Sequence, residues 1–558
     1  MRPLVIAATL FGFSASEAQA DAFEQLRSAY AERDAAAAAK AYGPDAVVTY
    51  RYDGSAEERH VGSAAIARSF QSLFDQIDPN QRLDLNFRTT QKVGNMVSGY
   101  YRLRIAGAPT YGTFTVTLDG SGKFASDLGG SASMAAFEEA SGPLMFANDG
   151  EDLERAYYGK LTGRYRAADG CYLVVTRSIV RMFVRDTCTN QWRGLNRVSG
   201  REWTAGNTIV SEKKLVTYRF AELIGTGAAS VAVEGPAGTR TATRRDTYRR
   251  EDVSFTAGDG TRLTGTIYLP VGWKGRRPGS VMLHGSGAQD RDGYASIIGV
   301  LADQLADSGR VVLAYDKRGS GGSDGDGNRA GFDLLADDAM AAMSAVRARA
   351  EVDPARVGLA GSSQAGWVAA KAIARGAKPA DVLLLGAAGA AISVAEQNLY
   401  NTDVRLQCAK VAPADRRLAL RQQRAFFDFL GDSRMAGALD AVTAKARARP
   451  VLADWLFPDS RTTDRSAGAW YVVLDPAFDP LPLWRAYRGR TLFLFAEHDD
   501  ATPTREVLRR LAPLRATVKM LRAAQHLGLR ASDRCNGELN ALTAFSNELM
   551  PAIATFAQ

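Results

Sequence analysis

The sequence predicts an α/β fold in its second half, with a parallel sheet covered by helices on both faces. From about residue 251, short apolar runs occur that are typical of buried strands: SVMLHG, RVVLAYD, RVGLAG, DVLLLGA and TLFLFAE. They alternate with amphipathic stretches such as ASIIGVLADQLADSG and GWVAAKAIARG, as expected for strands joined by helices. Ligands of such sheets bind beyond the carboxyl ends of the strands, where we therefore expect the chemistry.

Two further segments precede this sheet. Residues 21–150 begin with helical stretches at 21–42 and 63–77, and alternating strand-like runs follow from about residue 83. This order resembles NTF2-like (SnoaL-like) domains, which are α+β cones. Residues 151–250 consist of short strand-like runs separated by Gly, Asn and Asp, which predicts a small all-β domain.

Length and composition fit a multidomain globular protein. The 558 residues exceed a single core at ~150 residues per domain, and 46% are apolar and 23% charged. The net charge of +8 is spread along the chain without a dense Lys/Arg block, which argues against a nucleic-acid partner.

The N-terminus predicts export. Residues 1–20 combine a charged start, the apolar run LVIAATLFGF and the small-residue site Ala18-Gln-Ala20, as in a cleavable signal peptide cut after Ala20. No cysteine follows the cut and no later segment has ~18 uncharged apolar residues. We therefore expect a periplasmic or secreted protein with no membrane anchor.

Export gives the cysteines a structural meaning. We expect the disulfides Cys171–Cys188 and Cys408–Cys535, the first closing a strand-like hairpin; inert buried thiols are the alternative. CxxC pairs are absent, and we expect no metal and no cofactor.

The stretch GLAGSSQAGW, residues 358–367, predicts a nucleophile between a strand and a helix. A nucleophile elbow needs small residues two before and two after the serine. Around Ser363 these are Gly361 and Ala365, whereas around Ser362 one would be Gln364, which would clash. Sterics therefore favour Ser363.

A serine nucleophile needs a base, and the chain has four histidines. In the order Ser, acid, His, only His498 and His526 follow Ser363. His526 lies in the loop after the next strand and is favoured over His498, which adjoins the candidate acids Asp499 and Asp500. The glycines of LHGSGAQ, residues 283–289, can turn a backbone N–H near Ser286 inward, to form an oxyanion hole with that of Gln364.

These blocks together resemble the α/β-hydrolase superfamily. SVMLHGSGAQDRDG, VVLAYDKRGSGGSDG, VDPARVGLAGSSQAGW, FAEHDDATP and AAQHLG occur in the family's order over residues 251–558, most like exported bacterial esterases and serine-peptidase-like hydrolases. The resemblance implies a Ser–His–Asp hydrolase of esters, or less readily of peptide bonds. It supports Ser363 and His526, and it selects Asp499 as the acid because the acid stands four residues before the proline. Ala365 departs from the usual glycine.

The resemblance also places a helical cap at about residues 391–485. Its Trp455, Phe457, Trp470 and Tyr471 either line an acyl pocket or pack in the core. We expect DKRGSGGSDGDG, from Asp316 onward, to be a flexible connection at the rim of the site, since it lacks the spacing of a phosphate-binding loop.

The sequence thus predicts an exported serine carboxylesterase acting on a small-molecule ester. A peptidase acting on peptides and a non-catalytic binding protein on a hydrolase fold remain as alternatives. The N-terminal domain is a candidate site of homo-oligomerisation.

Overall fold

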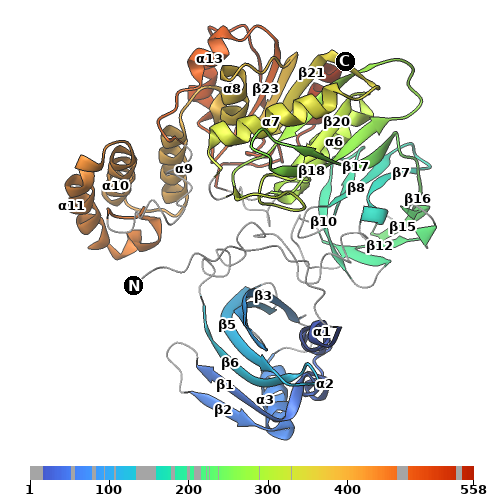
Figure 1. The fold of residues 1–558 in the computed structure, drawn as a ribbon, viewed down its shortest axis with the longest axis vertical. Helices are drawn as coiled ribbons and strands as arrows, with labels where there is room; N and C mark the ends of the chain where they lie inside the picture. The colour runs from blue at the N-terminus through green and yellow to red at the C-terminus, as the bar shows by residue number, and fades with distance from the viewer. Residues whose placement is uncertain are drawn as a thin grey trace. The chain divides into compact units, whose positions relative to one another are not determined.

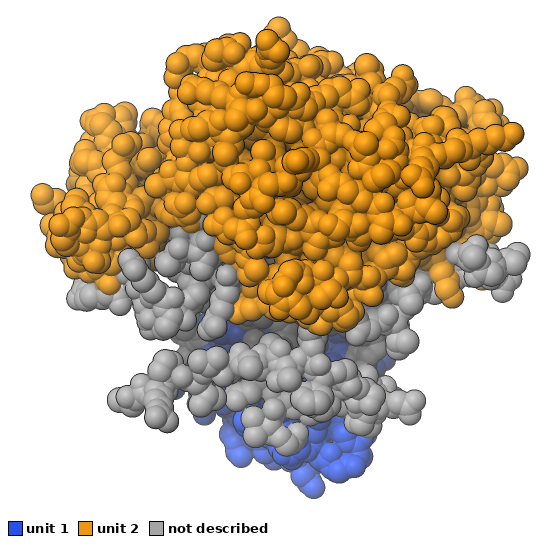
Figure 2. Space-filling view, turned by 45° about the horizontal axis from the view of Figure 1, so that its top comes forward, with its two compact units in different colours: residues 1–154 blue, residues 155–558 orange. Residues whose placement is uncertain are grey.

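The chain divides into two compact units, Met1–Glu154 and Arg155–Gln558 (Figure 2). The structure is a computed structural model and describes residues 17–558 except 52–56, 78–82, 94, 106–107, 133–158, 178–181, 198–200, 207–214, 222, 225–226, 237, 288, 328–329, 461–474 and 536–542. Residues 1–16, with most of the predicted signal peptide, and the predicted pocket residues Trp470 and Tyr471 lie outside the described part. In the described part, no helix is both long and apolar enough to cross a membrane.

The first unit is an α+β layer of helices on a six-stranded sheet (Figure 1). The strand order is β2-β1-β6-β5-β4-β3. The helices and the sheet share one apolar core. Within it, Phe70 and Phe74 of one helix pack on Tyr30 of another, at 5.8 and 5.3 Å between ring centroids. The sequence predicted this α+β character, while the resemblance to NTF2-like domains stays a prediction. The elements are α1 (Glu17–Glu32), α2 (Ala35–Lys40), β1 (Tyr42–Arg51), β2 (Glu58–Val61), α3 (Ser63–Asp75), β3 (Leu83–Val93), β4 (Met96–Ile105), β5 (Ala108–Leu118) and β6 (Phe124–Ser131).

The second unit begins with a closed β-barrel in the order β10-β11-β12-β15-β16-β7-β8-β9. Alternating apolar residues of these strands, such as Leu173, Val175 and Val184, fill its interior. The predicted small all-β domain is thus a barrel. Its strands are β7 (Gly163–Ala167), β8 (Tyr172–Arg177), β9 (Met182–Asp186), β10 (Trp192–Arg197), β11 (Glu202–Ala205), β12 (Val216–Phe220), β15 (Ser230–Gly235) and β16 (Gly238–Arg244), with the short pair β13 (Leu223–Ile224) and β14 (Gly227–Ala228) beside them.

An eight-stranded sheet follows, in the order β17-β18-β20-β19-β21-β22-β23-β24. The predicted hairpin forms antiparallel β17 and β18, and β19 to β24 run parallel, as the apolar runs predicted. The strands are β17 (Tyr248–Thr256), β18 (Arg262–Pro270), β19 (Arg277–Leu283), β20 (Val311–Tyr315), β21 (Val352–Ser362), β22 (Asp381–Leu385), β23 (Arg490–Ala496) and β24 (Thr517–Leu521).

Helices cover both faces of this sheet, and each face has its own apolar core. One core includes α7 (Phe332–Arg347), α8 (Ala365–Ala374), α13 (Leu481–Ala486) and α14 (Thr504–Leu511). The other includes α6 (Ile297–Asp307) and α15 (Leu549–Ala557). The strand ends between the two layers therefore form one edge at which loops from several strands meet.

The barrel and the sheet share a buried polar contact. Asp303, on α6, is 1% exposed and accepts from Arg164 at 2.9 Å, from Arg185 at 3.4 Å and from the Tyr248 hydroxyl at 2.7 Å. Beside it, Trp192 of the barrel packs on Phe545 at 4.8 Å between ring centroids. These contacts explain why barrel and sheet fall into one unit, although the sequence suggests two domains.

The predicted cap segment is helical between β22 and β23. It forms α9 (Val394–Cys408), α10 (Pro413–Gly431) and α11 (Ala436–Arg447), with the 3₁₀ turn η6 (Pro450–Trp455). Trp455 packs on an apolar cluster of these helices, and Phe457 packs on Phe426 and Phe427 at 5.3 and 5.7 Å. Packing within the helices, rather than lining a pocket, accounts for these two aromatic residues.

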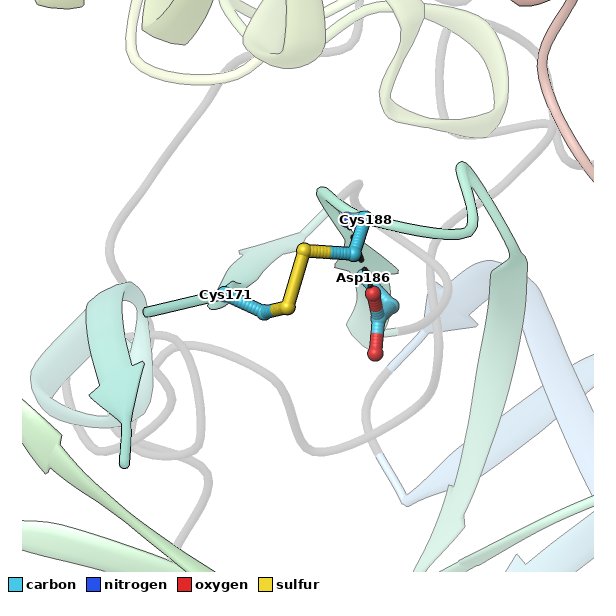
Figure 3. A group of neighbouring side chains, drawn as sticks. All are labelled: Cys171, Asp186 and Cys188. Carbon is cyan, nitrogen blue, oxygen red and sulfur yellow. Dashed lines mark hydrogen bonds between the residues drawn. A yellow bond between two sulfur atoms is a disulfide. The ribbon is translucent and has the colours of Figure 1, made fainter. Parts of the chain in front are cut away.

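Both predicted disulfides are present. Cys408–Cys535 joins the end of α9 to the segment that follows His526, and Cys171–Cys188 closes the hairpin of β8 and β9. Asp186 lies beside the second bridge, and its carboxylate accepts the backbone N–H of Cys188 at 3.0 Å (Figure 3). Because both sulfurs form the disulfide, neither cysteine has a thiolate that could bind a metal.

Candidate active site

Ser363 stands at the apex of a sharp turn between β21 and α8. Its φ is 54°, in the left-handed region that costs an L-residue roughly 1–2 kcal/mol. Its N–H donates to the carbonyl of Leu385 at 2.9 Å, which fixes the turn against the end of β22. Ser362 is 2% exposed at the end of its strand, whereas Ser363 is only partly buried. The turn therefore presents Ser363 rather than Ser362.

Close packing explains the small residues on either side of the turn. A Cβ atom on Gly361 would lie 2.3 Å from the Leu283 carbonyl oxygen and 2.7 Å from the Cβ of Ala365. Ala365 is fully buried at the start of α8. The site thus has room for alanine at 365, where the resemblance would place glycine, as long as residue 361 is glycine.

His526 and Asp499 meet in the loops after the neighbouring parallel strands β24 and β23. The Nδ1 atom of His526 lies 2.9 and 3.0 Å from the two carboxylate oxygens of Asp499. Asp499 also accepts the backbone N–H groups of Ala501 and Thr502, at 2.9 and 2.7 Å. Its side chain is fully buried, and that of His526 is 15% exposed. The carboxylate is therefore held rigidly and points at one ring nitrogen.

This contact sets the protonation of the imidazole. A carboxylate only accepts, so Nδ1 carries the proton and Nε2 is left as the acceptor. Burial favours the neutral ring, but the charge and hydrogen bond of Asp499 outweigh it and raise the pKa of His526 above its usual value. The backbone carbonyl of Asp500 instead accepts a hydrogen bond from the Asn401 side chain at 3.0 Å. Asp499 is thus the carboxylate that contacts His526.

Ser363 and His526 border the same strand end. The Ser363 N–H binds Leu385, the last residue of β22, and His526 packs on the next residue, Gly386. A Cβ atom on Gly386 would lie 3.1 Å from both Cε1 and Nδ1 of the imidazole. The absence of a side chain at 386 therefore leaves room for the ring beside the strand end that holds the Ser363 turn.

Two backbone donors flank Ser363. A Cβ atom on Gly285 would lie 3.6 Å from the Cβ of Ser363, so the loop after β19 runs directly beside the serine. Among the described residues, no acceptor bonds the N–H of Ser286 in that loop, or that of Gln364 at the start of α8. Unpaired N–H groups on both sides of a serine suit an anion that forms on it.

The connection after β20 differs from the prediction of a flexible rim. Asp316 and Lys317 are 0% and 6% exposed, and Asp316 binds the side chain of Arg291 through both carboxylate oxygens at 3.0 and 2.7 Å. The Lys317 ammonium donates to the Gly285 carbonyl and to the side-chain oxygen of Gln364. Burial lowers its pKa to about 7, although the charge of Asp338 acts in the opposite direction. The glycines of this segment suggested mobility, but Asp316 and Lys317 at its start are buried and hydrogen-bonded.

Of the remaining histidines, His284 is structural. It is 4% exposed, its Nε2 lies 2.6 Å from the Tyr315 carbonyl, and burial lowers its pKa to about 3. His284 is therefore a neutral donor that ties β19 to β20. His60 lies on β2 in the first unit, with its Nε2 3.6 Å from a carboxylate oxygen of Glu58.

The motifs at the strand ends agree with a comparison to known families. Residues 281–538 match the model of the alpha/beta hydrolase family. This part of the chain has an alpha/beta hydrolase fold, with the parallel strands and the strand–serine–helix turn described above. The uncharacterized protein YfhR of Escherichia coli K12 is 34% identical over 131 residues, which are 24% of this chain and 44% of YfhR. YfhR of strain O157:H7 is 34% identical over 121 residues, 40% of its length, so the chain spans less than half of these relatives.

Solved structures also match part of the chain, at low identity and low TM-score. They include alpha/beta hydrolase GrgF from Penicillium (20% identity, TM-score 0.32, 50% of this chain and 91% of that one). Est1E of Butyrivibrio proteoclasticus with ferulic acid has 15% identity and a TM-score of 0.35, with 55% of this chain and 97% of that one covered. The esterase EaEST of Exiguobacterium antarcticum has 16% identity and a TM-score of 0.31, with 49% and 92% covered.

Proposed function

We propose that the protein is an exported serine hydrolase that cleaves carboxylic esters through an acyl-enzyme intermediate. The observation that carries the proposal is the fixed pair of Asp499 and His526 beside a serine held in a left-handed turn. A serine hydroxyl is a weak nucleophile, and an oriented imidazole is the group that activates it.

In the proposed reaction, the Oγ of Ser363 attacks the ester carbonyl while Nε2 of His526 takes its proton. The carbonyl oxygen becomes an oxyanion, which accepts from the backbone N–H groups of Ser286 and Gln364. When the C–O bond breaks, the imidazolium returns its proton to the leaving alcohol. Water then repeats the sequence on the acyl-enzyme and releases the acid. Asp499 stabilises the imidazolium and stays ionised.

The proposed export rests on the signal-peptide pattern of residues 1–20, and two disulfides agree with an oxidising compartment. The helices between β22 and β23 are proposed as a cap, because α9 reaches the acid loop: the Tyr400 hydroxyl donates to the Asp499 carbonyl at 2.8 Å.

The test is hydrolysis of p-nitrophenyl esters by the full-length protein, together with labelling by a fluorophosphonate probe. Ser363→Ala should abolish labelling and lower turnover by about 10⁶-fold, toward the background rate. Ser362→Ala is the matched control, since this buried neighbour should leave labelling intact. Equal turnover by wild type and Ser363→Ala would refute the assignment. Cleavage of aminoacyl-naphthylamides but not of esters would favour a peptidase, and no labelling of wild type would favour a binding protein.

A further inference from the structure

Lys317 contacts both segments that carry the unpaired backbone donors. Its Nζ lies 3.0 Å from the carbonyl oxygen of Gly285 and 2.9 Å from that of Gly287, on either side of Ser286. It also lies 2.6 Å from the side-chain oxygen of Gln364, the residue after the nucleophile. The three hydrogens of the ammonium thus have three oxygen acceptors, drawn from two separate loops.

The strand order makes this contact possible. β19 lies between β20 and β21, so the segment after β20 is one strand away from the loop of β19 and two strands away from the turn of β21. The long side chain of Lys317 spans this distance from within the protein, with 6% of the residue exposed. Its backbone N–H adds a bond to the Gln289 carbonyl at 3.0 Å, which ties the same loop a second time.

Peptide geometry turns these contacts into an effect on the site. Across a trans peptide the C=O and the following N–H point in opposite directions, and the described residues contain no cis peptide. With the Gly285 oxygen held on Lys317, the N–H of Ser286 must point away from Lys317. The side chain of Gln289 supports this arrangement, since its amide donates to the Ser286 carbonyl at 2.8 Å and accepts from the Gly285 N–H at 3.3 Å.

A buried ammonium is costly unless its hydrogens are satisfied. Burial disfavours the charged form of Lys317 and lowers its pKa. Three hydrogen bonds to oxygens offset this cost, and two of these oxygens belong to the glycine-rich loop. Without the ammonium, glycines 285 and 287 would leave this loop free to rotate its peptides, because glycine adopts more backbone conformations than any other residue.

We propose that Lys317 is a positioning residue for the two backbone donors of the oxyanion site, Ser286 N–H and Gln364 N–H. It holds the Gly285 carbonyl, which belongs to the same peptide as the Ser286 N–H, and it holds the side chain of Gln364. The inference rests on the proposed ester hydrolysis, and it assigns to the DKRG segment a role in the reaction. Lys317 touches no reacting atom and acts through the loops that it binds.

The test compares Lys317→Met, which keeps the length of the side chain and removes its donors, with wild type. Loss of one aimed donor lowers kcat by roughly 10²–10³-fold, while KM should change by less than about threefold, because the oxyanion forms after binding. A trifluoromethyl ketone, whose adduct with serine carries the same oxyanion, should lose affinity by the same factor as kcat/KM. Lys519→Met, at a half-buried lysine on β24 paired with Glu548 at 3.5 Å, is the matched control and should keep wild-type kcat.

Lys317→Gln keeps an amide donor and is the second variant, with an expected kcat between those of wild type and Lys317→Met. Wild-type kcat in either variant, or ketone affinity that does not follow kcat/KM, would overturn the inference. A crystal structure of Lys317→Met with the Gly285 carbonyl in its present direction would overturn it whatever the activity. The proposed function fails by a different result, which is ester turnover that survives in Ser363→Ala with Lys317 intact.

Discussion

The left-handed turn at Ser363 predicts that this position is a source of strain. We compare Ser363→Gly with Ser363→Ala, because both remove the nucleophile and they differ only in the Cβ atom. At a φ of 54° the methyl group of alanine costs roughly 1–2 kcal/mol, which glycine avoids. Glycine gains about 0.4–1 kcal/mol less from folding because its unfolded chain is more flexible. The glycine variant should therefore be more stable by about 1 kcal/mol.

The assay is thermal unfolding of the two inactive variants under oxidising conditions. The second unit has roughly 400 residues, and an unfolding entropy of about 2.1 cal/mol/K per residue converts this difference into about 1 °C in Tm. The same pair of substitutions at Ser362 is the control, since this residue ends β21 and is not among the residues of positive φ. Glycine within a strand is destabilising by roughly 0.5–1 kcal/mol relative to alanine, so the sign should reverse there. A Ser363→Gly variant no more stable than Ser363→Ala would refute the strain.

Three further predictions concern the acid, the base and the two disulfides. Asp499→Asn should lower kcat by about 10⁴-fold in the p-nitrophenyl ester assay by favouring the wrong tautomer of His526, and retention of more than a tenth of the activity would contradict this. Because only the neutral imidazole accepts a proton, kcat/KM of wild type should rise with pH through a pKa above the usual 6.5 of histidine, and a midpoint below that value would be inconsistent with the contact to Asp499. Replacing Cys408 and Cys535 by serine should lower the free energy of unfolding, measured by denaturant titration, by up to about 5 kcal/mol. Replacing Cys171 and Cys188 by serine opens a shorter loop and should lower it by about 3 kcal/mol.

The sequence predicted the parts of the candidate site that depend on local geometry. Gly361 and Ala365 identify the elbow because the backbone there allows only small side chains, and the order of motifs leaves few histidines that can serve Ser363. The parallel strands were visible as apolar runs because both of their faces are buried. The expected compartment predicted disulfides, and the hairpin that Cys171 and Cys188 flank indicated the first pair. The pairing of Cys408 with Cys535 required the fold to bring distant segments together.

Other features depend on distances that the sequence does not show. Lys317 stands in a glycine-rich run that favours a loop, and its role appears only when strand order brings β20 within reach of the loops after β19 and β21. The closure of the barrel and its attachment to α6 depend in the same way on pairings between distant residues, such as Arg164 with Asp303. Local pattern cannot reveal a buried charge whose partner lies 139 residues away.

The buried seam between the barrel and α6 has an evolutionary consequence. Asp303 meets two arginines of the barrel, Arg164 and Arg185, and a tyrosine hydroxyl away from water. Loss of Asp303 would remove the carboxylate that both buried arginines share, and breaking a buried ion pair typically costs 3–5 kcal/mol. The three charged positions should therefore be gained and lost together among related chains. Barrel and hydrolase would then be inherited as one module, and an exchange of either part between relatives should succeed only when the whole seam moves with it.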